Sequence, residues 1–244
     1  MLARTTKRAE TSNRSGSPSP RRGGRPRSET AASLIYSDLR AELVSLRRPP
    51  GQTVSEAEIA LAYGVSRTPV REAILRLSDE GLLQIFPQSG IIVSRIPLAA
   101  LPEAIIIRKA LEETTARLAA ERATSSQILT LHSIVERQRE ADAANDSEAF
   151  HQADELFHGT IAEVAGHPGI WKLILQVKIH VDRYRRLTLP QAGRIARVIA
   201  EHQAILSAIE KHDPQTARLA MEAHLERLLR DIRATQSVNL EFFD

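Results

Sequence analysis

Residues 64–81 read GVSRTPVREAILRLSDEG, and this stretch decides the fold of the N-terminal part of the chain. Ser66 is a residue type that caps the start of a helix, and Pro69 falls in the first turn, where a missing N–H costs little. Gly81 follows the last apolar residue of the pattern, as glycine often does where a helix ends. The stretch therefore predicts a helix from Arg67 to about Gly81.

The residues before this stretch predict two more helices. Ser55 stands three residues before Glu58, which is the spacing of a capping box, and it opens a short helix that runs through Ala62. Gly64 occupies the turn position that favours a left-handed backbone. Apolar residues recur at helical spacing over residues 30–48, so we expect a further helix there.

After Gly81 the hydrophobic pattern changes its period. Residues 83–86 and 91–94 are rich in β-branched and aromatic side chains, and residues 87–90, PQSG, read as the turn of a hairpin. Short helices joined by a glycine turn and followed by a hairpin predict a winged helix-turn-helix over residues 29–97. In such a unit the second helix of the pair enters the major groove of DNA.

The start of that second helix carries side chains suited to DNA. Arg67 and Arg71 are four residues apart and share one face, and arginine that binds guanine through two hydrogen bonds is the commonest specific base contact. Ser66 and Thr68 can bind phosphate, as can the free N–H groups of the helix N-terminus. Two solvated arginines would be the ordinary interpretation of this pair in another setting.

The remainder of the chain predicts an all-helical domain over residues 98–236, followed by a C-terminal tail at 237–244. Aromatic residues make up only 4% of the chain, so the core must be built from aliphatic side chains, which favours packed helices. We find no strand pattern beyond Leu98. The expected fold class is mainly α, and the expected helices are 102–123, 125–143, 147–165, 169–188, 191–211 and 214–235.

The composition limits the chemistry and the cellular location that we expect for the protein. The chain has no cysteine, which excludes disulfides and thiolate metal sites. No apolar run approaches the roughly 20 residues that span a bilayer, and no secretory signal is visible, so we expect a cytoplasmic protein without a membrane partner.

The net charge of +3 is unevenly distributed. Residues 1–28 hold eight basic residues and one acid, which leaves the rest of the chain at −4. We expect this basic tail to be disordered. Its segment 23–27, GGRPR, resembles the core of an AT-hook, and the alternative is a solvated arm that contacts phosphates without specificity.

The N-terminal unit resembles the DNA-binding domain of the GntR family. Segments 64–74 (GVSRTPVREAI), 80–82 (EGL) and 90–93 (GIIV) match that family in order and spacing, within a resemblance that covers about residues 31–96. The resemblance implies that Arg67 and Arg71 read bases. It also implies that Thr68 and the wing around Gly90 contact the DNA backbone.

The C-terminal half resembles the FadR subfamily, whose helical domain is called FCD. Segments 154–158 (DELFH), 201–205 (EHQAI) and 223–225 (AHL) match its motifs. The resemblance implies that a metal-binding set is formed by Asp154, His158, His202 and His224. Three imidazoles and a carboxylate suit Zn²⁺, Ni²⁺, Mn²⁺ or Fe²⁺, with zinc favoured, although a single histidine is more often structural.

Arg108 is the first candidate for binding an effector. It belongs to segment 107–112 (IRKALE), which also matches the FCD pattern, and it lies among apolar neighbours, so it needs a partner. That partner is either Glu112, one helical turn on, or the carboxylate of an effector. Arg183 is a second, weaker candidate.

Together these patterns predict a metabolite-responsive transcription regulator, expected to be a repressor that a small carboxylate releases from its operator. We expect a homodimer on an inverted repeat of double-stranded DNA and no enzymatic activity. Two alternatives remain at this point: a metalloenzyme that uses the same histidine and aspartate ligands, and an architectural DNA-binding protein with a metal-free C-terminal domain.

Overall fold

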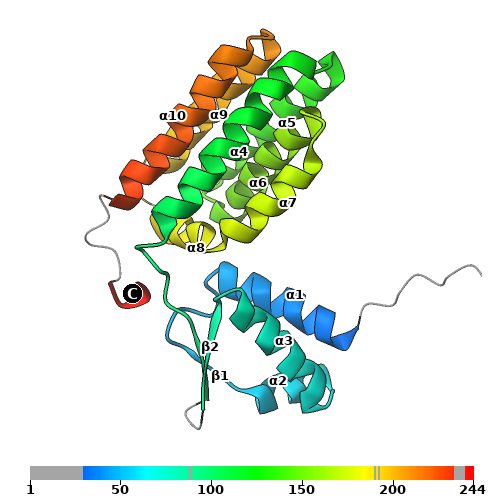
Figure 1. The fold of residues 1–244 in the computed structure, drawn as a ribbon, viewed down its shortest axis with the longest axis vertical. Coiled ribbons are helices and arrows are strands. Elements are labelled where there is room, and N and C mark those ends of the chain that lie inside the picture. The colour runs from blue at the N-terminus through cyan, green and yellow to red at the C-terminus, as the bar shows by residue number, and fades with distance from the viewer. Residues whose placement is uncertain (1–29, 88–89, 190, 192, 234–239) are drawn as a thin grey trace, which may run out of the picture. The chain divides into compact units, whose positions relative to one another are not determined.

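The computed structural model describes residues 30–87, 90–189, 191, 193–233 and 240–244. The predicted basic tail at 1–28, with its AT-hook-like segment, therefore lies outside the described residues. Within the described part, the chain forms a mainly α-helical protein with one small sheet, as the sequence predicted (Figure 1). No described helix is both long enough and apolar enough to cross a membrane.

Three helices of the N-terminal unit match the sequence-based expectation: α1 (Ala31–Val44), α2 (Glu56–Tyr63) and α3 (Arg67–Asp79). The Ser55 hydroxyl accepts a hydrogen bond from the Glu58 N–H, which satisfies one of the free donors at the start of α2. Gly64 ends α2 with φ of 62°, a left-handed conformation that costs glycine little, and it makes the tight turn into α3.

The wing is a three-stranded antiparallel sheet in the order β1-β3-β2. Strands β2 (Leu83–Phe86) and β3 (Gly90–Val93) form the predicted hairpin, in which Leu83 pairs with Val93 and Phe86 pairs with Gly90. Strand β1 (Thr53–Val54) was not predicted, because two residues are too short to show an alternating pattern.

The N-terminal helices and the sheet enclose a shared aliphatic core. Its fully buried members come from α1, α3 and the hairpin. They include Ile35, Val70, Ile74, Leu77, Leu82 and Val93. These are the apolar positions of the helical and alternating patterns, so burial of one face explains why the local sequence forms these elements.

Among the described residues, seven helices form the C-terminal bundle. In chain order they are α4 (Leu101–Arg122), α5 (Ser125–Ala143), α6 (Ser147–Val164), α7 (Pro168–Val177), α8 (Ile179–Thr188), α9 (Arg194–Glu210) and α10 (Pro214–Arg233). A capping box at Thr124 and Gln127 starts α5, and the Asp146 side chain caps α6. Five of the six predicted helices are confirmed with small shifts of their ends.

The prediction of one helix over 169–188 is wrong. The chain breaks there into α7 and α8 at Lys178, whose ψ of −1° departs from the value of about −42° in a regular α-helix. No glycine or proline marks the break, so the sequence carries no local stop signal. Lys178 is buried, and its ammonium group donates to Glu155 and Asp182, so tertiary contacts hold the break.

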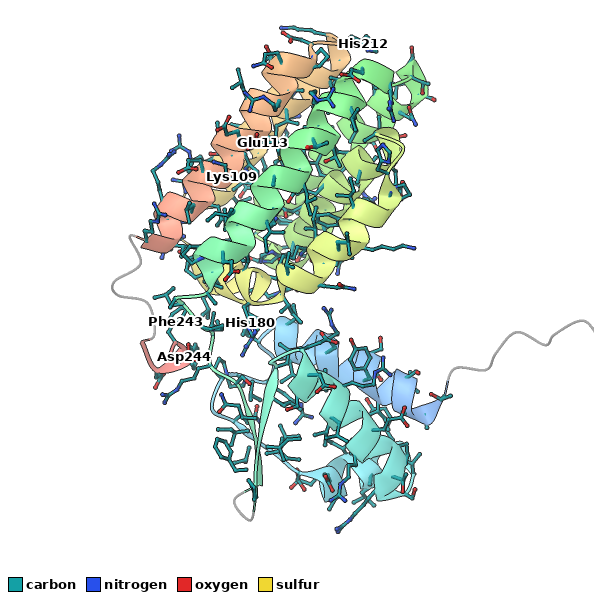
Figure 2. The ribbon with its side chains drawn as sticks, in the orientation of Figure 1. Lys109, Glu113, His180, His212, Phe243 and Asp244 are labelled. Atoms are coloured by element: carbon teal, nitrogen blue, oxygen red, sulfur yellow. The ribbon has the colours of Figure 1, made fainter. Side chains whose placement is uncertain are left out.

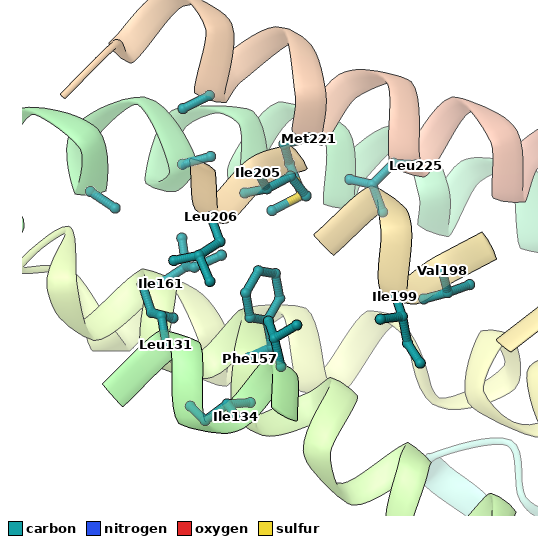
Figure 3. Packing of buried hydrophobic residues seen from close by; sticks show 14 of the residues in the cluster. Leu131, Ile134, Phe157, Ile161, Val198, Ile199, Ile205, Leu206, Met221 and Leu225 are labelled. Atoms are coloured by element: carbon teal, nitrogen blue, oxygen red, sulfur yellow. The ribbon is translucent and has the colours of Figure 1, made fainter. Parts of the chain in front are cut away.

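Aliphatic side chains and phenylalanine fill the bundle, as Figure 3 shows. Phe157 of α6 lies among residues from α5, α9 and α10 and has no exposed surface. It stacks on the ring of His202, with ring centres 4.4 Å apart. The apolar core therefore extends directly to the polar residues that form the candidate site.

The linker between the sheet and α4 is held by two other segments. Ile96 donates to the Phe242 carbonyl at 2.8 Å and pairs with Phe243, so the last residues of the chain, including the short helix η1 (Leu240–Phe242), lie along the linker. Arg183 of α8 donates to the Ser94 carbonyl at 2.6 Å. His180, Phe243 and Asp244 are labelled in this region in Figure 2.

Candidate functional site

Three histidines from three helices meet inside the bundle. His158 lies on α6, His202 on α9 and His224 on α10, and one ring nitrogen of each lies within 4.8 Å of the others. All three side chains are buried. Three imidazole nitrogens at this separation have the arrangement that a divalent metal ion requires.

A polar partner orients each of the three rings through its Nδ1 atom. Each partner is a carboxylate or amide oxygen on another helix of the bundle. The three pairs are His158 Nδ1 with Glu112 Oε2 at 2.5 Å, His202 Nδ1 with Gln138 Oε1 at 2.9 Å, and His224 Nδ1 with Glu201 Oε2 at 2.8 Å.

This pattern leaves the Nε2 atoms as the available ligands. Metal-binding histidines commonly use one ring nitrogen for the ion and the other for an oxygen that fixes the ring and its tautomer. Both ring nitrogens of His158 and Nε2 of His202 are buried and have no hydrogen-bond partner among the described residues, so His158 Nδ1 meets Glu112 as a close ion-pair contact only. Buried polar atoms without a partner are costly, so the residues present fit a metal ion.

Burial also favours neutral, metal-binding imidazoles. It lowers the pKa of His202 well below the usual value, and the neighbouring His224 lowers it further. Burial likewise lowers the pKa of His224, although its hydrogen bond to Glu201 opposes the shift. Neutral imidazole is the form that binds metals, so these two rings need no deprotonation to act as ligands.

Asp154, the fourth predicted ligand, lies beside the histidines but is engaged by an arginine. Its Oδ1 is 3.7 Å from His202 Nε2. Arg185 of α8 donates to both carboxylate oxygens, at 2.6 and 2.7 Å. Burial alone would raise the pKa of Asp154, but the Arg185 guanidinium outweighs it and holds the pKa well below the ordinary range, so the carboxylate is ionised.

Arg108 is paired in this structure with the residue one turn along its helix. Both side chains are buried, and Arg108 Nε donates to Glu112 Oε1 at 2.6 Å. Of the two partners that the sequence left open, the structure therefore shows Glu112. Because Glu112 also contacts His158, Arg108 is connected to the histidine cluster through one carboxylate.

Arg183 contacts a different part of the molecule. It is buried, it donates to the linker carbonyl of Ser94, and its Nη1 lies 3.3 Å from His180 Nδ1. These contacts do not bring it together with the three histidines. Its place in effector binding stays a prediction from the sequence.

Sequence reasoning missed three residues that support the site, Gln138, Arg185 and Glu201, and it missed the contact of Glu112 with His158. Glu201 directly precedes His202 in segment 201–205, but its carboxylate contacts His224 on another helix. Gln138 and Arg185 carry no local signal, because each acts across helices.

A pocket reaches this cluster from the side of α8, α9 and α10. It has a volume of about 380 Å³ including space open to solvent, and both His224 and Arg185 line it. Three more arginines, Arg194, Arg197 and Arg227, stand around it. The space inside it that a water molecule can occupy is only about 30 Å³, so a small ligand would enter only if the partly exposed side chains of Arg197 and Arg227 moved outward.

The predicted DNA-reading residues lie together on the surface of the N-terminal unit. Arg67, Thr68 and Arg71 are exposed on the first turns of α3 and line one groove. Arg71 lies 3.3 Å from a carboxylate oxygen of Glu56 in an exposed ion pair, which is weak enough to be exchanged for another partner.

The two remaining residues of that set have conformations suited to their predicted contacts. Ser66 takes the N-cap position of α3, but its hydroxyl makes no capping hydrogen bond. Gly90 opens β3 with φ of 101°, a conformation that favours glycine.

The helix-turn-helix with its wing and the helical bundle with its histidine cluster define a two-domain DNA-binding regulator. The chain belongs to the GntR family of bacterial regulatory proteins: that family's model matches residues 31–93, and the FCD domain model matches residues 103–227. It is a transcription regulator with a GntR reading domain and an FCD domain.

Curated relatives and solved structures agree with this assignment. The chain is 35% identical to an uncharacterised HTH-type transcriptional regulator of Streptomyces ambofaciens, covering 86% of this chain and 88% of the relative. It is 33% identical to the HTH-type transcriptional repressor RspR of Escherichia coli, covering 86% and 92%. The fold resembles the structure of E. coli McbR/YncC with a TM-score of 0.70 at 24% identity, covering 84% of this chain and 97% of that one.

Proposed function

We propose that this protein is a homodimeric repressor that releases its operator when a small carboxylate binds beside a divalent metal ion. The observation that carries the proposal is the convergence of His158, His202 and His224, each with its Nδ1 atom close to an oxygen on another helix, which favours Nε2 as the ligand. RspR is named a repressor, and a relative of Paenarthrobacter nicotinovorans is named a probable repressor of a D-xylose utilisation operon.

The three histidines would hold the ion, with Asp154 as a fourth ligand. Zinc is the favoured ion because it binds imidazole nitrogen readily and accepts four-coordinate sites. When bound, the ion would offer a position to an effector oxygen. The residues themselves supply orientation and charge: Glu112, Gln138 and Glu201 fix the rings, and Arg185 holds Asp154 in place.

Charge balance supports an anionic effector. Three arginines, Arg108, Arg185 and Arg227, pair with three carboxylates, Glu112, Asp154 and Glu201, so the charges around the neutral histidines balance. A divalent cation adds two positive charges to this balance, and a bound carboxylate offsets one of them. Buried charge is costly unless it is compensated, so a bound carboxylate fits the metal-loaded site.

Binding rather than turnover is proposed for this site. Glu155, the residue next to Asp154, contacts Lys178 and not the cluster, and the three carboxylates around the histidines already hold a histidine or an arginine. A general base would need to be within hydrogen-bond reach of a reacting group. The attached DNA-reading domain favours a sensing role. An effector that binds the DNA-bound and DNA-free states with different affinity would change how much operator is occupied.

The dimer follows from the reading domain. A single helix-turn-helix contacts few bases, whereas two-fold symmetry doubles the contacts on an inverted repeat. Sedimentation of the protein with operator DNA selected from a random pool should give two subunits for each site. One subunit on a specific site would contradict the dimer.

The test of the metal site compares two double variants by native mass spectrometry after zinc loading. His202→Ala with His224→Ala should lose the ion, whereas His132→Ala with His167→Ala, which changes two histidines outside the cluster, should keep it. Fluorescence anisotropy should show operator binding by both. Small hydroxy acids should weaken that binding only in the wild type and the control. Full metal occupancy in the His202, His224 double variant would eliminate the proposed site.

A further inference from the structure

The pocket beside the histidine cluster has an excess of positive charge that the proposed metal site does not use. Four arginines line it, Arg185, Arg194, Arg197 and Arg227, against two acids, Glu201 and Asp231. Arg185 belongs to the inner site through its ion pair with Asp154. The other three arginines therefore need a separate explanation.

Two of these arginines have acidic partners but remain open to solvent. Arg197 lies 2.8 Å from Asp231, and its side chain is 38% exposed. Arg227 lies 2.8 Å from Glu201, and its side chain is 47% exposed. Partly exposed ion pairs of this kind are weak, so each guanidinium has donors to spare for a ligand.

Arg194 has no ion-pair or hydrogen-bond partner for its side chain among the described residues. It lies on the first turn of α9, one turn before Arg197, so both side chains lie on the same side of the helix. The three arginines come from two helices, α9 and α10, and they stand around one pocket. A solvated helix face would not require this convergence.

The pocket also has an apolar wall. Leu189, Val198 and Leu228 line it together with the arginines. Apolar surroundings reduce competition from water and strengthen the interaction of a guanidinium with an anion. Arginine suits carboxylate and phosphate because its planar group binds two oxygens at once.

The pocket borders the proposed metal site at two residues. His224, one of the proposed ligands, lines it, and Glu201 joins the two regions, because one of its oxygens contacts His224 Nδ1 and the other contacts Arg227 Nε at 2.8 Å. A ligand that reaches the ion by this path passes between the arginines. Its outer end would then lie beside Arg194 and Arg227.

We propose that Arg194, Arg197 and Arg227 form a subsite for a second anionic group of the effector, so that the effector is a small dianion. One carboxylate would bind at the metal end, and a carboxylate or phosphate at the other end would bind the arginines. This inference rests on the proposed function, which supplies the metal end.

The test uses matched pairs of acids that differ in one terminal anionic group. The pairs are 2-hydroxybutyrate with malate, 2-hydroxyvalerate with 2-hydroxyglutarate, and gluconate with glucarate; 6-phosphogluconate adds a phosphate arm. We expect calorimetric titration of the full-length, zinc-loaded protein to show that each dianion binds about tenfold more tightly than the monoacid of its pair. This is the affinity gain expected for one charged hydrogen-bonded contact. The phosphate arm shows which terminal group the arginines prefer.

Variants then assign the preference to the arginines. Arg194→Gln and Arg227→Gln, alone and combined, should reduce the preference for the dianion while the monoacid affinity and the zinc content stay unchanged. Arg218→Gln is the matched control, because Arg218 is also on α10 but contacts Glu113 and Glu222 and does not line the pocket. It should keep the full preference.

The possible failures can be told apart. If every pair binds equally, if no acid binds, or if the double variant keeps the preference, the subsite is wrong. If a monoacid releases operator DNA from the zinc-loaded protein and the matching dianion binds no more tightly, the subsite proposal is wrong. The proposed function then remains supported. If the protein takes up no zinc but still binds a dianion tightly, the arginine subsite is supported. The proposed role of the metal ion is then wrong.

Discussion

Arg185 donates to both carboxylate oxygens of Asp154, at 2.6 and 2.7 Å, and both side chains are buried. Asp154 was predicted as a metal ligand, so the structure gives it a second role as the counter-ion of a buried arginine. An ion that bound Asp154 would share the carboxylate with Arg185 and would compensate its negative charge in the same way.

This relationship predicts that zinc can partly replace Arg185. In the variant Arg185→Gln, metal-free protein should lose about 3–5 kcal/mol of unfolding free energy, because a buried carboxylate is left without its partner. Zinc should restore part of that loss, so the stabilisation by zinc should be larger in the variant than in the wild type. Urea unfolding with EDTA and with zinc measures both values. Equal stabilisation of the two proteins by zinc would show that Asp154 does not contact the ion.

The pairing of Arg108 with Glu112 predicts a separation of metal binding from effector response. Arg108→Gln removes a charge but leaves His158, His202 and His224, so the protein should still bind zinc. If Arg108 exchanges Glu112 for the effector carboxylate, operator DNA should stay bound when the acid is added. Zinc content and anisotropy of labelled operator, measured on the same preparation, check this. Normal release by the acid would assign Arg108 a purely structural role.

The exposed arginines of α3 predict a loss of sequence discrimination. Arg67→Ala and Arg71→Ala should each cost about 1–3 kcal/mol of specific binding, since a base contact made through two hydrogen bonds is lost. Binding to unrelated DNA should change little. Arg117→Ala is a control, because Arg117 pairs with Glu121 on α4 in the C-terminal bundle. Unchanged specificity in both α3 variants would show that other residues read the bases.

Deletion of residues 2–28 should affect DNA binding differently. The segment carries eight basic residues and one acid, so its loss should weaken binding to every sequence and make the affinity less dependent on salt. Anisotropy titrations at several salt concentrations, with specific and unrelated DNA, give both slopes. If the deletion removed specificity and left the salt dependence unchanged, the tail would be reading bases.

His180 predicts a pH dependence of stability. Burial and the neighbouring Arg183 together lower its pKa from 6.5 to about 4, against an opposing effect of Asp244. Between these two values the unfolded chain binds a proton that the folded chain does not, so stability should fall as the pH decreases from about 6.5 towards 4. Urea unfolding in EDTA at pH 7.5 and 5 should show a smaller decrease for His180→Gln than for the wild type. An identical decrease in both proteins would mean that His180 titrates normally.

The sequence by itself determined the reading domain, because its signals are local. The cap at Ser55, the glycine turn at Gly64 and the pairing of strands 83–86 and 90–93 each depend on a few nearby residues, and the structure confirms each one. It also placed Asp154 and His158 on one buried face, because four residues are about one helical turn. The family resemblance then grouped His202 and His224 with them.

Only the tertiary structure decided the contacts between helices. The engagement of Gln138, Arg185 and Glu201 around the histidines depends on which helices pack together, and hydrophobic periodicity shows only which face of a helix is buried. The break at Lys178 has a related cause, since the buried Lys178 ammonium pairs with Glu155 of α6 as well as with Asp182, and no local stop signal marks the position. The charged pocket between α8, α9 and α10 could not be found from the sequence, because arginines far apart in the chain become neighbours only when the bundle forms.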